Sequence, residues 1–98
     1  MKIDIKKDGT ALTITPDGRL DTKTAPELQS VVDENIKGVT ELTFDLKKLV
    51  YLSSAGLRMF MSAQKTMTAQ GEMKLLNVSD DIIDILEMVG LTDVFTIE

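Results

Sequence analysis

The sequence predicts one α/β domain over residues 1–98, with a mixed four- to five-stranded sheet and helices packed against it. Short runs in which apolar and polar residues alternate are typical of half-buried strands. They are separated by segments whose apolar residues recur every three or four positions, as in amphipathic helices. Strands separated by helices run parallel, whereas strands joined by a tight turn run antiparallel, so the predicted sheet is mixed.

The first two strands are expected to form a hairpin. Ile3 and Ile5 alternate with polar residues, and Leu12 and Ile14 do the same after an Asp8-Gly9 turn signal. Residues 16–18, Pro-Asp-Gly, are expected to break or bend the second strand.

The first helix has clear start and stop signals. Thr24-Ala-Pro-Glu27 matches a capping box with proline in the first turn, and Gly38 is suited to a left-handed cap at the other end. An apolar stripe lies between them: Leu28, Val31, Val32 and Ile36.

A central strand is predicted over residues 40–46, and Leu49 and Val50 are expected to return to the core. A second helix is predicted from about Ser54 to Ala69. One row at helical spacing comprises Leu57, Phe60, Met61, Gln64 and Thr68, and a second row comprises Met59, Ala63 and Met67. A methionine row is usually adaptable core, but it also suits a contact surface, and Met59 is the position that tests these alternatives.

The last part of the chain predicts a strand over residues 73–77 and a helix that begins after Ser79 and stops at Gly90. Val94, Phe95 and Ile97 then form a short strand or a docked tail.

Composition excludes several functions. The net charge of −5 is not gathered in blocks, which argues against nucleic acid and against an anionic membrane surface. The chain has no histidine and no cysteine, so the usual zinc sites, thiol nucleophiles and a Ser-His-Asp triad are ruled out. We therefore expect no catalytic residue, metal or cofactor. The N-terminus does not match a signal peptide and no apolar stretch is long enough to span a bilayer, which predicts a cytoplasmic protein.

The junction before the second helix is the candidate site. Ser53 and Ser54 stand where small hydroxyl residues can either cap a helix or expose a hydroxyl for phosphorylation. Asp21 and Asp45 end the strands before the two helices and are expected to share an edge of the sheet with Ser54. Each acid is equally compatible with capping its own turn.

Two motifs resemble the STAS domains of bacterial anti-sigma-factor antagonists. They are Gly18-Arg-Leu-Asp21 and Tyr51-Leu-Ser-Ser-Ala-Gly-Leu-Arg58, and the resemblance covers essentially the whole chain. It implies a STAS-like fold and places the family's phosphoserine at Ser54. The residue before it, often acidic in related sequences, is Ser53 here, a candidate second site. The predicted partner-binding surface comprises Asp21, Asp45, Ser53, Ser54, Gly56, Arg58 and Met59.

The resemblance also implies a partner-switching cycle. The unmodified protein binds an anti-sigma factor that is also an ATP-dependent serine kinase, so that the sigma factor is released. Phosphorylation of Ser54 ends this complex, and a PP2C-type phosphatase restores the serine. Arg58, four residues further along the helix, is the expected counterion of the phosphate.

Two alternatives remain open from the sequence. The second hypothesis, after the partner-switching cycle, is a constitutive STAS subunit of a larger regulatory or transport assembly, in which Ser54 is a helix cap. A small hydrolase is the other alternative, but without histidine it needs a Ser-Lys arrangement, and none of Lys47, Lys48 and Lys65 has an evident reason to be buried beside Ser54.

Overall fold

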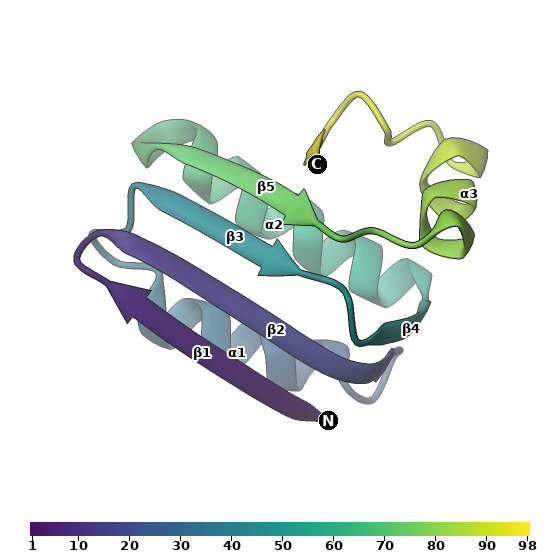
Figure 1. Ribbon diagram of the computed structural model, residues 1–98, viewed down its shortest axis with the longest axis horizontal. Coiled ribbons are helices and arrows are strands. Elements are labelled where there is room, and N and C mark those ends of the chain that lie inside the picture. Colours follow the sequence, from purple (N-terminus) through teal and green to yellow (C-terminus); the bar gives the residue numbers. More distant parts are fainter.

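A central sheet organises the chain in a computed structural model that describes residues 1–98. The strands are β1 (Lys2–Asp8), β2 (Ala11–Leu20), β3 (Glu41–Asp45), β4 (Leu49–Leu52), β5 (Glu72–Leu76) and β6 (Thr96–Ile97). Their order is β1-β2-β3-β5-β6, and β4 pairs with the far half of β2 (Figure 1). Only the β1–β2 pair is antiparallel, so the sheet is mixed as predicted.

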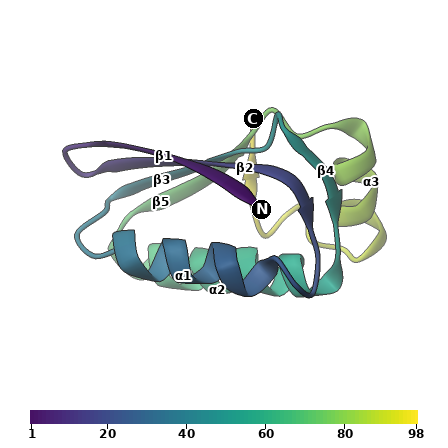
Figure 2. The same cartoon turned by 90° about the horizontal axis from the view of Figure 1, so that it is seen from below.

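Three helices complete the fold: α1 (Ala25–Asn35), α2 (Ser54–Gln70) and α3 (Asp80–Met88). In Figure 2, α1 and α2 lie side by side beneath one face of the sheet, and α3 stands at the end beside β4. The other face of the sheet has no helix over it. This one-sided cover explains the alternation in the sequence, because inward residues of each strand meet the helices and their neighbours face water.

The core lies between the sheet and the two long helices, and it contains 22 buried apolar residues. Phe44 of β3 and Phe60 of α2 meet edge-to-face, with ring centroids 4.9 Å apart. Phe95, after α3, contacts Phe60 in the same manner at 6.4 Å, which docks the C-terminal segment on the core. Of the two predicted outcomes, a short strand or a docked tail, the strand is present as β6, which pairs with β5.

The sheet has six strands, so the prediction of four or five was too low. The missed strand is β4, in which Leu49 and Leu52 are buried, whereas Val50 is 71% exposed and Tyr51 is 38% exposed. The prediction that Val50 returns to the core is wrong. β4 has only four residues, and its two middle positions are both exposed. It therefore lacks the period-two alternation from which a strand is predicted in a sequence.

The predicted bend in β2 is present. The strand continues through Pro16-Asp17-Gly18, and its register against β4 shifts between Gly18 and Arg19. The first half of β2 pairs with β1 and β3, and the second half turns toward the helix layer to pair with β4 (Figure 2). This bend carries Leu20 and Asp21 to the place where α2 begins.

Candidate functional site

The two serines at the start of α2 have different roles. Ser53 has extended backbone angles (φ −94°, ψ 173°) and is the N-cap; its Oγ accepts a hydrogen bond from the Gly56 N–H at 3.4 Å. Its own N–H donates to the Leu20 carbonyl at 2.9 Å. Ser54 is the first helical residue, is exposed, and its hydroxyl makes no hydrogen bond. The structure therefore leaves Ser54 as the free hydroxyl of the pair.

Gly56 lets the first turn of α2 pack directly on the ends of β2 and β4. A Cβ atom at this position would lie 2.6 Å from Cδ1 of Leu52 and 2.8 Å from Cγ of Leu20. Because Gly56 is buried by these two leucines, it acts by positioning the serines. The prediction that Gly56 itself contacts a partner is corrected to this positioning role.

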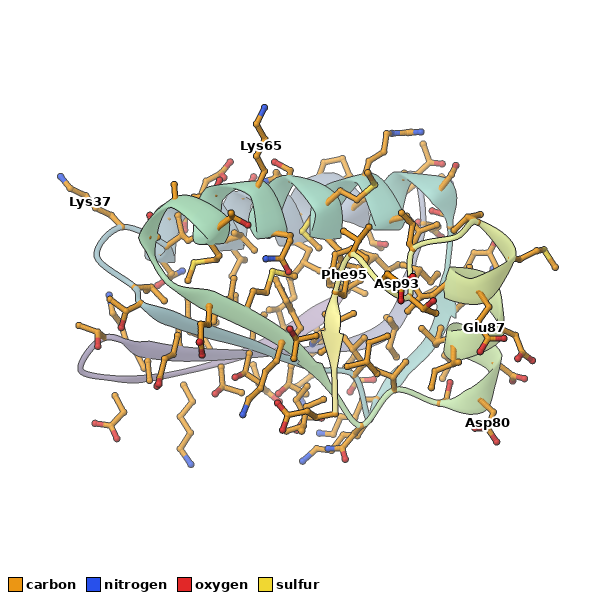
Figure 3. The ribbon with its side chains drawn as sticks, turned by 90° about the horizontal axis from the view of Figure 1, so that it is seen from above. Lys37, Lys65, Asp80, Glu87, Asp93 and Phe95 are labelled. Atoms are coloured by element: carbon orange, nitrogen blue, oxygen red, sulfur yellow. The ribbon has the colours of Figure 1, made fainter.

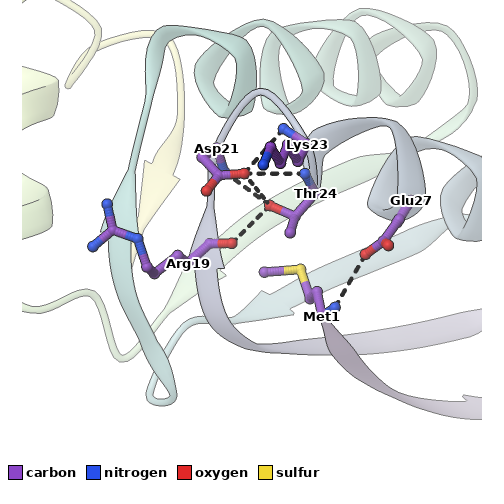
Figure 4. Close-up of polar contacts among 6 residues, drawn as sticks. All are labelled: Met1, Arg19, Asp21, Lys23, Thr24 and Glu27. Atoms are coloured by element: carbon purple, nitrogen blue, oxygen red, sulfur yellow. Dashed lines mark hydrogen bonds and ion pairs between the residues drawn. The ribbon is translucent and has the colours of Figure 1, made fainter.

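Asp21 ends β2 in a tight hydrogen-bonded turn (Figure 4). Its Oδ1 accepts from the N–H groups of Lys23 at 3.0 Å and Thr24 at 3.1 Å, and its N–H donates to Thr24 Oγ1 at 2.8 Å. The backbone hydrogen bond from Thr24, with those from Lys23 and the Thr24 hydroxyl and the charge of Arg19, holds the pKa of Asp21 below its ordinary value despite desolvation. Asp21 is thus an oriented, ionised carboxylate whose Oδ2 makes no hydrogen bond.

The predicted capping box is wrong. The Thr24 side chain makes no cap bond and instead donates from Oγ1 to the Arg19 carbonyl at 2.7 Å. Glu27 pairs with the N-terminal amino group at 3.1 Å (Figure 4). Asp21 takes part in both replacements: its N–H donates to Thr24 Oγ1, and its Oδ1 accepts from the Thr24 N–H that a Glu27 side chain would bind in a capping box.

Asp21 and the serines lie at the same junction. Leu20 pairs with Leu52, and the Ser53 N–H bonds to the carbonyl of Leu20, the residue before Asp21. The expected proximity of Asp21 and Ser54 therefore has a structural basis in the pairing of β2 with β4.

Asp45 does not join this junction. Phe44, the residue before Asp45, faces the helix layer, so strand alternation turns the Asp45 side chain to the opposite face of the sheet. Phe44 pairs with Ile14 of β2, which lies seven residues before Asp21. At about 3.3 Å per residue, seven residues span about 23 Å of strand. The expectation that Asp45 shares an edge with Asp21 and Ser54 is wrong, since topology alone does not give strand lengths or side-chain faces.

Asp45 instead ties β3 to the segment after β5. It accepts hydrogen bonds from Asn77 Nδ2 at 3.0 Å and from the Lys47 N–H at 3.2 Å, and it pairs with Lys47 Nζ at 3.5 Å. Desolvation is the largest single influence and raises the pKa of Asp45. The hydrogen bonds from Asn77 and Lys47 and the Lys47 charge together outweigh it and hold the pKa below its ordinary value.

The prediction that Met59 of α2 belongs to the partner-binding surface is wrong. Met59 is 3% exposed and belongs to the core, whereas Met61, in the other predicted row, is 42% exposed. The buried side of α2 takes Gly56 and residues from both predicted rows: Leu57, Met59, Phe60, Ala63 and Met67. Arg58 is exposed and its side chain makes no ion pair or hydrogen bond.

Sequence reasoning missed one pair at this junction. Arg19 and Tyr51 are register partners on β2 and β4, and the Arg19 guanidinium carbon lies 4.2 Å from the Tyr51 ring centroid. Both residues belong to the two quoted motifs. Their contact was not predictable because β4 was not recognised as a strand.

The comparisons with known proteins agree with this fold. The model of the STAS domain family matches residues 2–98, so the chain belongs to the STAS domain family. An anti-sigma-B factor antagonist of Listeria monocytogenes is 31% identical over 101 residues, covering 100% of this chain and 89% of that protein.

Solved structures share the fold at lower sequence identity. The crystal structure of an anti-sigma factor antagonist from Mycobacterium paratuberculosis has a TM-score of 0.88 at 16% identity, over 98% of this chain and 83% of that one. The Bacillus cell fate determinant SpoIIAA in its phosphorylated form has a TM-score of 0.77 at 18% identity, over 99% and 91% of the two chains. Among the helices of this chain, none combines the length and apolar character needed to cross a membrane.

Replacing Gly56 tests the close packing at the junction. We expect Gly56→Ala to lower the free energy of unfolding by about 1–3 kcal/mol, because the new methyl group overpacks against Leu20 and Leu52. Urea unfolding followed by circular dichroism measures the change. Ser62→Ala, at an exposed position of the same helix, should stay within about 0.5 kcal/mol of the wild type. Equal urea midpoints for Gly56→Ala and the wild type would contradict the packing argument.

The Asp45 network predicts a specific acid sensitivity. Because its pKa is lowered in the folded state, Asp45 contributes stability that is fully present above its unfolded pKa of about 3.9 and is lost as the pH falls through the lower folded value. Asp45→Asn should be less stable than the wild type at pH 6 but should lose less stability between pH 6 and pH 3. Urea midpoints at the two pH values measure this difference.

Asp93→Asn is the matched control, since Asp93 is exposed and makes no hydrogen bond or ion pair. It should keep the stability loss of the wild type on acidification. If Asp45→Asn and Asp93→Asn lose the same stability between pH 6 and pH 3, Asp45 does not carry the effect.

Proposed function

We propose that this chain is an anti-sigma-factor antagonist whose hold on its partner is controlled by phosphorylation of Ser54. The observation that carries the proposal is the division between the two serines: the Ser53 hydroxyl caps α2, whereas the Ser54 hydroxyl is exposed and unbonded. Membership in the STAS family and the names of relatives such as the Listeria antagonist support the proposed partner.

In the proposed cycle the chain is a ligand and a substrate, and the partner is the catalyst. The unphosphorylated junction binds a cytoplasmic anti-sigma factor that is also a serine kinase. This kinase transfers the γ-phosphoryl group of ATP to Ser54 Oγ, which loses its proton, and ADP leaves. A PP2C-type phosphatase then hydrolyses the phosphate ester with water, returning the Ser54 hydroxyl and inorganic phosphate.

The start of α2 suits an added negative charge. The first turns of α1 and α3 contain acidic residues, Glu27 in α1 and Asp80 and Asp81 in α3, whereas the first turn of α2 contains none. The positive end of the α2 dipole is therefore not compensated within its own first turn. A phosphate adds about −1.5 to −2 charges at neutral pH, and at this end of a helix it stabilises the fold.

The same charge opposes the partner complex. A partner that binds the ionised Asp21 and the neutral serine would meet a second, strongly hydrated anion at the phosphorylated junction. Burying this anion costs desolvation free energy, and it repels any group that is already placed to face a negative surface. Release therefore follows from local electrostatics, with no change of fold required.

Phosphorylation mapping tests the acceptor. We expect incubation with the anti-sigma kinases of the host and ATP to place phosphate on Ser54, as mapped by tandem mass spectrometry. Ser54→Ala should abolish modification. Ser53→Ala should still be modified although loss of its cap costs about 1 kcal/mol of stability. Modification at Ser53 or at a threonine instead of Ser54 would sink the proposed acceptor.

A charge mimic separates the effect on binding from the effect on folding. Ser54→Asp should raise the free energy of unfolding by about 0.3–1 kcal/mol through the helix dipole, and it should weaken binding to the anti-sigma factor about tenfold or more, which is about 1.4 kcal/mol. Ser54→Asn has nearly the same size without the charge, and it should keep most of the affinity. Calorimetric titration measures the affinities.

Equal affinities of the wild type and Ser54→Asp would favour the alternative in which the chain is a constitutive subunit of a larger assembly. A Ser54→Asp variant that is less stable than Ser54→Asn would contradict the dipole argument.

A further inference from the structure

Arg19 is an exposed cation whose hydrogen-bonding groups are unused. Its guanidinium lies over the ring of Tyr51, and no hydrogen bond or ion pair involves its side chain. A guanidinium has five N–H donors in a rigid plane. Stacking on an aromatic face fixes that plane without occupying the donors. Arg19 is therefore held ready with its donors free for an anion.

The backbone on both sides of this stack is fixed. The Arg19 carbonyl accepts a hydrogen bond from Thr24 Oγ1 at 2.7 Å, which ties it to the Asp21 turn. Figure 4 shows the side chain of Arg19 extending away from this turn. On the other strand, Tyr51 lies one residue before Leu52, which pairs with Leu20.

The stack lies on the exposed side of the strand pair that ends at the serines. Leu20 and Leu52 are buried, whereas the residues before them, Arg19 and Tyr51, are exposed to solvent. Ser54 follows Tyr51 by three residues and is exposed. Other charged groups at this end are Asp21 and Lys23 from the turn and Arg58 from α2. Of the cations among them, Arg19 is the one fixed by a contact within the chain.

We propose that Arg19 is an anion receptor at this junction and that a phosphoryl group on Ser54 draws its guanidinium away from Tyr51. This inference rests on the proposed modification of Ser54. In the unmodified protein the guanidinium stays on the ring. In the modified protein two of its N–H groups donate to phosphate oxygens, which is the stronger of the two interactions at an exposed site.

The chain contains its own reporter for this movement. Tyr51 is the one tyrosine, and there is no tryptophan, so intrinsic tyrosine fluorescence comes from the ring beneath Arg19 alone. The test uses the full chain with phosphoserine installed at position 54 during translation, so that no kinase is needed. We expect Tyr51 emission and ring-proton chemical shifts to differ between the serine and phosphoserine forms. In Arg19→Gln this difference should disappear.

Phosphorus NMR gives a second readout. Removing one cation that is hydrogen-bonded to the phosphate, at about 4 Å in a water-like dielectric, should raise the second pKa of the phosphate by about 0.8 in Arg19→Gln. Arg19→Lys keeps the positive charge but loses the planar N–H donors of the guanidinium. It should therefore keep most of the lowering of the phosphate pKa that Arg19 causes. Lys65→Gln is the matched control, because Lys65 points into solvent further along α2 (Figure 3), and it should change neither readout.

Three other results would contradict the assignment of Arg19 as the counterion of the phosphate on Ser54. If Arg58→Gln raises the phosphate pKa and Arg19→Gln does not, the counterion is Arg58. If neither variant changes it, the phosphate has no fixed counterion. If Arg19→Gln weakens binding of the unmodified chain to its anti-sigma factor but leaves the phosphate unchanged, the guanidinium receives a partner carboxylate instead. Because the phosphoserine is installed directly, these results do not depend on whether a kinase modifies Ser54.

Discussion

The contact of the first turn of α2 with Leu20 and Leu52 is the constraint on which the junction depends. Gly56 has no side chain, so the helix approaches the ends of β2 and β4 closely enough for Ser53 to bond to Leu20 and to cap the helix. One geometry thereby fixes the cap and the exposed hydroxyl of Ser54 and places both next to the turn that holds Asp21. Since close-packed interiors do not deform gradually, a change at Gly56 would move the two serines relative to that turn.

The length and bend of β2 connect this junction to the core. The first half of the strand supplies Leu12 and Ile14 to the core, and the second half carries Arg19 and Asp21 beyond the end of β3. The same length separates the roles of the two strand-end acids. Asp45 is the last residue of β3, and its hydrogen bond from Asn77 connects β3 to the segment after β5, so Asp45 has a structural role. Asp21 instead lies at the surface where the helices begin.

Much of this architecture was predictable from the sequence, because it depends on local patterns. Asp8 pairs with Ala11 across the predicted hairpin, and the three helices occupy the predicted segments. The errors share one cause, which is that they depend on tertiary contact. Val50 is apolar but lies on the outer face of a short strand, and Met59, a predicted contact position, is buried because its side of α2 packs into the core. The Arg19–Tyr51 stack depends on the register of two strands, which a single sequence does not reveal.

The distribution of charge around α2 explains how this chain would tolerate the proposed phosphorylation of Ser54 although the proposed partner complex would not. Its first turn has no acidic residue, and the cap is supplied by the neutral Ser53. A phosphate on the next residue therefore occupies a position where the helix itself favours negative charge. Because the capping hydroxyl belongs to Ser53, the modification of Ser54 removes no hydrogen bond from the fold. The cost of the added charge would thus fall on the proposed complex, where the anion must lose water, rather than on the isolated domain.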